Sequence, residues 1–133
     1  MVDINHWFYF IISVKITCTI WKHLVQFLKL VKGDYMQFKN TDKIIGTSLQ
    51  GYIKASYEQL VQTFGHQKHN GDGWKTTCEW ALEWEDGTVA TIYDWKQSTG
   101  YLGEDGIDYK DVTDWNVGGN NLNSVWYVRR ELS

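Results

Sequence analysis

The stretch that decides the fold runs from residue 74 to residue 96 and reads WKTTCEWALEWEDGTVATIYDWK. Apolar and polar residues alternate along its first half, which is the pattern of a β-strand with one buried face. Asp86-Gly87 suits a two-residue turn, because both residues tolerate positive φ angles. The alternation then resumes over residues 88–96. The sequence therefore predicts an antiparallel, tryptophan-rich hairpin at the centre of a sheet.

A two-residue turn fixes which residues of the hairpin face each other. It predicts four pairs on one apolar face: Trp84 with Val89, Leu82 with Thr91, Trp80 with Tyr93, and Cys78 with Trp95. The same register sets Glu79 opposite Asp94, and like charges in direct contact destabilise a sheet. This pair is either a solvated margin of the sheet or a polar site where hydroxyl groups or a cation offset the repulsion.

Composition limits the class of protein. With 133 residues and a formal net charge of −3, the chain suits one domain with a real core and does not suit a long nucleic-acid duplex as partner. Its eight Trp, eight Tyr and five Phe residues fill a small core, and they also form platforms on which bases and sugars stack. Cys18 and Cys78 form no spacing motif, which indicates reduced thiols and a cytoplasmic protein.

Residues 1–43 are predicted to be an extension of a single domain formed by residues 44–133. Three lysines interrupt the apolar run of this extension: Lys15, Lys22 and Lys29. The uninterrupted run falls short of the roughly 20 residues that a membrane span needs. From residue 16 to residue 31 the apolar spacing is helical. The segment is a helix packed on the domain or on a second copy, a helix on a membrane surface, or sequence upstream of a start at Met36.

Two helices flank the hairpin in the sequence. Ser56 and Gln59 form a capping box, and Gly65 is a stop signal, so a helix is predicted over residues 56–64. This helix is expected to cover three apolar residues of the hairpin: Ala81, Ala90 and Ile92. A second helix is predicted over residues 122–132 with Asn121 as its N-cap. The predicted fold is α+β, with an antiparallel sheet of about four or five strands and both helices packed against it.

A strand is predicted over residues 111–117, followed by Gly118-Gly119 and then Asn120-Asn121 before the second helix. Glycines at a strand end allow close approach of a ligand, and the free N–H groups of a helix N-terminus bind phosphate. The alternative is that the glycine pair is only a turn. Nine residues are the candidate ligand-binding set: Tyr93, Trp95, Trp115, Asn116, Gly118, Gly119, Asn120, Arg129 and Arg130.

Arg129 and Arg130 are the only arginines of the chain. Either is suited to a bidentate phosphate clamp, and the alternative is that these cations only balance the C-terminal end of the helix. Two helical turns span about 11 Å, so Arg129 is too far along its helix to reach a phosphate at the N-terminus. We therefore expect Arg129 to reach the ligand of a neighbouring copy in a homo-oligomer.

No catalytic motif is present. The sequence contains no Ser-His-Asp order, no phosphate-binding loop motif and no paired-cysteine metal site. His66, His69 and Asp72 lie in a loop without the spacing that a helix imposes on metal ligands, and a solvated loop is the simpler interpretation. We expect a protein that is not an enzyme and that needs neither a metal nor a cofactor.

Three stretches resemble a family of small phage-encoded anti-defence proteins: residues 46–52 (GTSLQGY), 86–96 (DGTVATIYDWK) and 114–119 (DWNVGG). The family is identified as the Thoeris anti-defence group, which sequesters cyclic ADP-ribose signals. The resemblance implies a non-catalytic, cytoplasmic, oligomeric protein of an infected bacterial host. It also implies aromatic residues stacked on adenine, with arginine or backbone N–H groups on the diphosphate.

A second hypothesis belongs to a different class. The chain is then an anti-CRISPR-like inhibitor that binds a host defence protein directly. An acidic surface patch would favour it, but the acidic residues are scattered among the predicted strands rather than grouped.

Overall fold

The computed structural model describes residues 22–24 and 36–133. Residues 22–24 form a helical turn, and the rest of the helix predicted over residues 16–31 lies outside the described residues. The chain divides into one unit over Met1–Tyr35 and a second over Met36–Ser133, and the second is described below. Within the described part of the chain, no helix is both long enough and apolar enough to cross a membrane.

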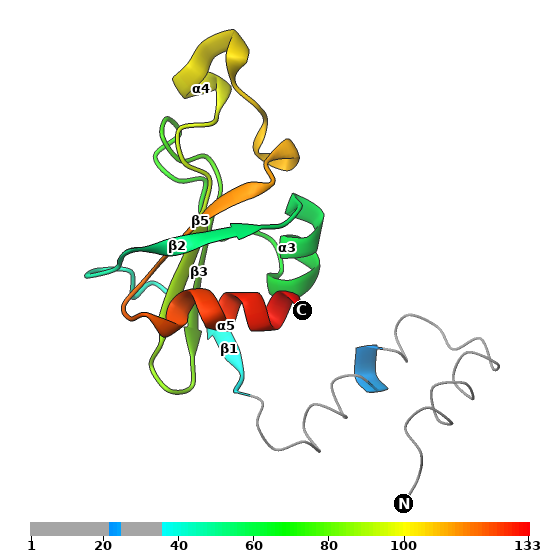
Figure 1. Ribbon diagram of the computed structural model, residues 1–133, viewed down its shortest axis with the longest axis vertical. Helices are drawn as coiled ribbons and strands as arrows, with labels where there is room; N and C mark the ends of the chain where they lie inside the picture. Colours follow the sequence, from blue (N-terminus) through cyan, green and yellow to red (C-terminus); the bar gives the residue numbers. More distant parts are fainter. Residues whose placement is uncertain (1–21, 25–35) are drawn as a thin grey trace, which may run out of the picture. The chain divides into compact units, whose positions relative to one another are not determined.

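The second unit is an antiparallel sheet of five strands in the order β1-β3-β4-β5-β2. The strands are β1 (Phe38–Asn40), β2 (Ser48–Lys54), β3 (Glu79–Trp84), β4 (Val89–Tyr93) and β5 (Asp114–Gly119). Figure 1 shows α5 (Asn123–Leu132) lying across the sheet and α3 (Tyr57–Phe64) beside it. The short α4 (Thr99–Leu102) lies in the connection between β4 and β5. The predicted α+β fold is confirmed.

The strand β1 shows that the folded unit begins before residue 44. Phe38 pairs with Trp84 of β3, and its ring lies 5.3 Å from that of Phe64 in α3. The boundary predicted at residue 44 was wrong, because it separates this strand from its sheet. A strand of only three residues leaves too short an alternation to be recognised in the sequence.

The hairpin is present, but its register differs from the predicted one by one residue. Trp80 faces Ile92 and Leu82 faces Ala90. The Trp84 amide donates to the Thr88 carbonyl at 2.9 Å, which makes a three-residue loop in which only Gly87 has a positive φ, of 87°. The predicted two-residue turn was wrong, and so was the predicted pairing of Glu79 with Asp94, since Glu79 faces Tyr93.

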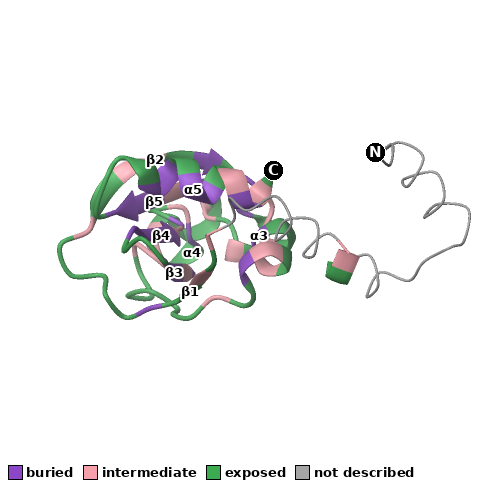
Figure 2. Ribbon diagram, turned by 90° about the horizontal axis from the view of Figure 1, so that it is seen from below, coloured by how far each residue is buried: buried purple, intermediate pink, exposed green. Residues whose placement is uncertain are grey.

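The change of register moves residues of β4 between the two faces of the sheet. Ala90 and Ile92 join Trp80, Leu82 and Trp84 on the face that the helices cover, which we call the helix face. The opposite face is called the open face. Figure 2 shows buried residues along β5 and α5. The largest fully buried side chains are Trp80, Trp84, Trp115, Leu60, Leu82 and Ile92.

The helix α3 begins and ends as predicted. The Ser56 hydroxyl accepts from the Gln59 amide, and the Gln59 side chain accepts from the Ser56 amide. Gly65 follows the helix with a φ of 82°. Its carbonyl accepts a hydrogen bond from Trp80 Nε1 at 2.8 Å. The helix therefore packs on the tryptophan face of the hairpin, and the prediction that it covers Ala81 was wrong because Ala81 points to the open face.

The connection from β1 to β2 joins the two edges of the sheet, so residues 41–47 must cross it. The Thr41 amide donates to the Ala81 carbonyl at 3.1 Å, and Thr41 and Lys43 both donate to the Glu83 carboxylate. Glu83 shares the parity of Ala81 in β3, so the crossing chain begins on the open face. The rest of the open face, toward Tyr93, carries the site described next.

Candidate functional site

The Gly118-Gly119 junction is built for close packing. Both glycines are buried members of β5. A Cβ atom on Gly119 would collide with the side chain of Ser124 in α5, and one on Gly118 would lie 2.6 Å from Thr91 Oγ1. The Ser124 hydroxyl donates to the Val89 carbonyl at 2.7 Å. The missing side chains therefore let α5 sit directly on the sheet.

The two asparagines after the glycines bind the hairpin loop and the start of α5. Asn120 Oδ1 accepts from the Val89 amide at 2.8 Å, and Asn120 Nδ2 donates to the Gly87 carbonyl at 3.0 Å. Asn121 Oδ1 accepts from the Asn123 amide at 2.8 Å, which is the capping function predicted for Asn121. The polar groups of this junction thus serve the fold from within.

Trp115 is buried in the core. Its indole Nε1 donates to the Ala55 carbonyl at 2.9 Å, and its ring meets that of Trp80 edge to face at 5.5 Å. Trp115 is fully buried, so it offers no surface on which a ligand can stack.

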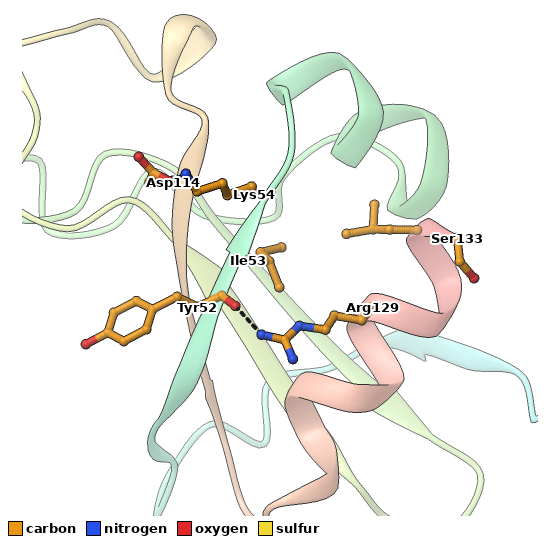
Figure 3. Close-up of a pocket in the computed structure, with 7 residues that line it drawn as sticks. Tyr52, Ile53, Lys54, Asp114, Arg129 and Ser133 are labelled. Carbon is orange, nitrogen blue, oxygen red and sulfur yellow. Dashed lines mark hydrogen bonds and ion pairs between the residues drawn. The ribbon is translucent and has the colours of Figure 1, made fainter.

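The two arginines diverge. Arg129 donates to the Tyr52 carbonyl at 3.0 Å, on the outer edge of β2 (Figure 3). It lines a pocket of about 460 Å³ with Tyr52, Ile53, Lys54, Asp114, Leu132 and Ser133. Arg130 instead lies over the ring of Tyr127, with its guanidinium carbon 4.7 Å from the ring centre, and 3.6 Å from the Glu131 carboxylate.

Three members of the predicted set do come together on the open face. Tyr93 lies directly opposite Asn116 in the neighbouring strand. The rings of Tyr93 and Trp95 meet edge to face at 6.2 Å. Trp95 is 40% exposed, so part of its ring is available to a ligand.

Sequence reasoning missed the residues that surround Trp95. Trp74, Lys75, Lys96 and Tyr101 join it in what we call the aromatic–lysine cluster. Lys75 Nζ lies 4.9 Å from the ring centre of Trp74 and 5.9 Å from that of Trp95. Lys96 Nζ lies 5.4 Å from the ring centre of Trp95 and 5.7 Å from that of Tyr101. Trp74 and Tyr101 meet at 5.4 Å.

The backbone around the cluster is held by local hydrogen bonds. Asp72 Oδ1 accepts from the Trp74 and Thr76 amides, and these bonds lower the pKa of Asp72. Ser98 Oγ donates to the Trp74 carbonyl at 2.9 Å. The Lys96 amide donates to the Lys75 carbonyl at 2.8 Å, which joins the two lysine-bearing segments.

Lys96 itself is held in an uncommon conformation. Its φ angle is 58°, and among the described residues other than glycine it alone has a positive φ. Such conformations are sparsely populated and concentrate at functional sites, where the surrounding structure enforces them. Here the conformation places an ammonium group between two aromatic rings.

Asp94 anchors the strand beneath the cluster. This carboxylate is fully buried and accepts from the Thr77 amide at 2.7 Å, the Thr77 hydroxyl at 2.5 Å and the Cys78 amide at 2.9 Å. Burial, with a smaller contribution from Asp94, raises the pKa of the Cys78 thiol to about 12. The thiol therefore stays protonated and is a poor nucleophile.

A sequence signal for the cluster does exist. Trp-Lys occurs at both ends of the hairpin, as Trp74-Lys75 and as Trp95-Lys96. In an antiparallel hairpin these two ends lie side by side. Tyr101 carried no comparable signal, because it comes from the loop that follows β4.

The loop residues His66, His69 and Asp72 are not arranged around a common point that the structure marks as a site. Asp72 turns its carboxylate to backbone amides. His69 is bridged to Glu79 of β3, and its Nε2 lies 3.9 Å from Asp42.

Comparison with known proteins adds no relative. No protein-family model matches the chain, and no curated protein is significantly similar to it. Function is therefore argued from the geometry of the open face.

Proposed function

We propose that this protein is a non-catalytic binding protein that holds a nucleotide signal, of the cyclic ADP-ribose type, and sequesters it. The aromatic–lysine cluster carries the proposal. Exposed indole and phenol rings offer stacking surfaces to a base, and the ammonium groups of Lys75 and Lys96 lie beside those rings, where they can bind phosphate. Trp74 is 52% exposed and Trp95 is 40% exposed.

The charge distribution favours a small ligand. The chain as a whole is acidic, with a net charge of −3, so a long polyanion is repelled. A nucleotide is short enough to interact mainly with the two lysines of the cluster.

The biological setting of the proposal comes from the resemblance to phage anti-defence proteins. It is a cytoplasmic protein of an infected bacterium, assembled as a homo-oligomer, that lowers the free concentration of an immune signal. Binding without chemistry suffices for this role.

Titration calorimetry with cyclic ADP-ribose and ADP tests the proposal. Trp95→Ala and Trp74→Ala should each lower affinity by about 1–3 kcal/mol, because each removes a stacking surface. Trp126→Ala is the matched control, since Trp126 is 58% exposed but lies on α5, away from the cluster. Equal affinity in all variants, or no nucleotide binding by the wild type, would contradict the proposal.

A heat-release assay separates binding from catalysis. The protein is loaded with nucleotide, denatured by heat, and the supernatant is analysed by mass spectrometry. Intact nucleotide is the expected product, whereas an altered nucleotide would show that the protein is an enzyme.

Direct inhibition of a host defence protein is the second candidate function, and the edge of β2 favours it. The outermost strand of seven residues exposes backbone groups that can pair with a partner strand. Arg129 and Lys54 beside this edge would attract an acidic segment. If Lys54→Glu and Arg129→Glu abolish anti-defence activity in infected cells while Trp95→Ala does not, this function replaces the first.

A further inference from the structure

A row of five residues crosses the open face next to the aromatic–lysine cluster. Each member is paired with the next across neighbouring segments, in the order Tyr52, Asn116, Tyr93, Glu79 and His69. Directly paired residues of a sheet project to the same side, with about 5 Å between strands. We call these residues the cross-sheet row.

The row is continuous with the cluster. Trp95 follows Tyr93 by two residues, so both project from the same face, and their rings are in edge-to-face contact at 6.2 Å. Glu79 faces Tyr93 directly, so it is the diagonal neighbour of Trp95. Diagonal neighbours are within reach of long side chains, and a ring stacked on Trp95 therefore extends toward the Glu79 carboxylate.

Glu79 differs from the other acidic residues of the hairpin. Asp94 accepts three hydrogen bonds from Thr77 and Cys78. Glu83 accepts from Thr41 and Lys43. Glu79 is half-buried, yet no described residue donates a hydrogen bond to its carboxylate. Burial raises the pKa of Glu79, and nearby His69 partly offsets that effect. A half-buried acceptor without a donor is costly for the fold, which points to a donor supplied from outside.

We propose that the Glu79 carboxylate accepts a hydrogen bond from the exocyclic amino group of a base stacked on Trp95, so that the site selects adenine over purines with a carbonyl at that position. The inference rests on the proposed nucleotide-binding function. An ionised carboxylate only accepts hydrogen bonds. The adenine amino group donates to it, whereas the 6-carbonyl oxygen of hypoxanthine would place a second acceptor against it.

The test compares ADP with IDP, which carry the same ribose and diphosphate but adenine and hypoxanthine respectively. Both are titrated into the full chain by calorimetry. We expect ADP to bind about tenfold or more tightly than IDP, the effect of one hydrogen bond to a charged group. Glu79→Gln should bring the two affinities to within about threefold, because an amide both donates and accepts.

Glu83→Gln is the matched control. Glu83 lies on the same strand and the same face, but its carboxylate is already bound by Thr41 and Lys43. This variant should keep the wild-type preference for ADP. Circular dichroism on each variant confirms that the fold is retained.

The outcomes separate the inference from the function on which it rests. If ADP and IDP bind equally to the wild type, or if Glu79→Gln keeps the preference, the inference is overturned, while weakening of both ligands by Trp95→Ala would still support the nucleotide site. If neither nucleotide binds the wild type, both the inference and the proposed function are overturned.

Discussion

The two faces of this sheet use the same aromatic residues in opposite ways. On the helix face, Trp80 and Trp115 are fully buried, and each donates its indole N–H to a backbone carbonyl. At the end of the open face, Trp74 and Trp95 keep about half of their surface or somewhat less in solvent, and lysine ammonium groups lie over their rings.

The difference shows that aromatic content alone does not reveal a binding site. A buried tryptophan contributes apolar area and edge-to-face contacts to the core. An exposed one flanked by cations contributes little to stability and remains available to a ligand. The distinction depends on the face of the sheet from which a residue projects, and four predictions follow that distinction from the largest effect to the smallest.

Trp115→Ala should produce the largest loss of stability. Removing this buried ring leaves a cavity in the core, and the free energy of unfolding should fall by about 3–5 kcal/mol. Urea denaturation followed by circular dichroism measures it. The matched variant Trp95→Ala, on the open face, should change stability by no more than about 0.5 kcal/mol. Similar losses in both variants would break the contrast between the faces.

Asp94→Ala should come next. It leaves the Thr77 and Cys78 amides without their buried acceptor, and the unfolding free energy should fall by about 2–4 kcal/mol. Asp72→Ala removes a carboxylate that accepts the same kinds of amide bonds in an exposed loop, so its effect on urea denaturation should be clearly smaller. A larger loss for Asp72→Ala would mean that the loop, rather than the strand end, holds the hairpin together.

Gly119→Ala should lower the unfolding free energy by about 1–3 kcal/mol, because the added methyl group collides with Ser124. The measurement is again urea denaturation, with nucleotide titration on the same sample. If this variant kept full stability and lost nucleotide binding, Gly119 would have the ligand-binding role first predicted for it.

Acid titration should show the smallest effect. Tyr127 donates to Asp86 Oδ2 at 2.6 Å, and this bond, with one from the Thr88 amide, holds the pKa of Asp86 below its ordinary value of 3.8. The contribution to stability is present above that ordinary value and is lost as the pH falls through the lower pKa of the folded state. Tyr127→Phe should therefore flatten the loss of stability in acid.

The measurement is the urea midpoint between about pH 2 and pH 6. Tyr52→Phe is the control, since Tyr52 lies on the open face and bonds no carboxylate in the described residues. An unchanged acid profile for Tyr127→Phe would mean that Asp86 is held by the backbone amide alone.

Local patterns in the sequence were enough to predict the elements of the fold. The alternation over residues 74–96 predicts two strands, and the capping box of Ser56 and Gln59 predicts the start of α3, because each depends on residues close in the chain. Gly65 and the helical spacing of residues 122–132 are of the same kind. The α+β class follows from the order of these elements.

The sites of the molecule depended on contacts between distant residues. Gly118 and Gly119 are equally compatible with a phosphate site and with close packing, and Ser124 and Thr91 decide for packing. Trp74 and Tyr101 come together only through the loops at the ends of the strands, so no local pattern relates them. Of the predicted set, Tyr93, Trp95 and Asn116 share the open face because strands β4 and β5 are neighbours.

The register of the hairpin shows most clearly where the sequence stops and the tertiary structure decides. Asp86-Gly87 is compatible with a two-residue and with a three-residue loop, because both accept a glycine with positive φ. The choice depends on what each register buries. The observed one places Ala90 and Ile92 against the helices with Trp80 and leaves Tyr93 facing Glu79. Burial of apolar area against α3 and α5 therefore selects the register.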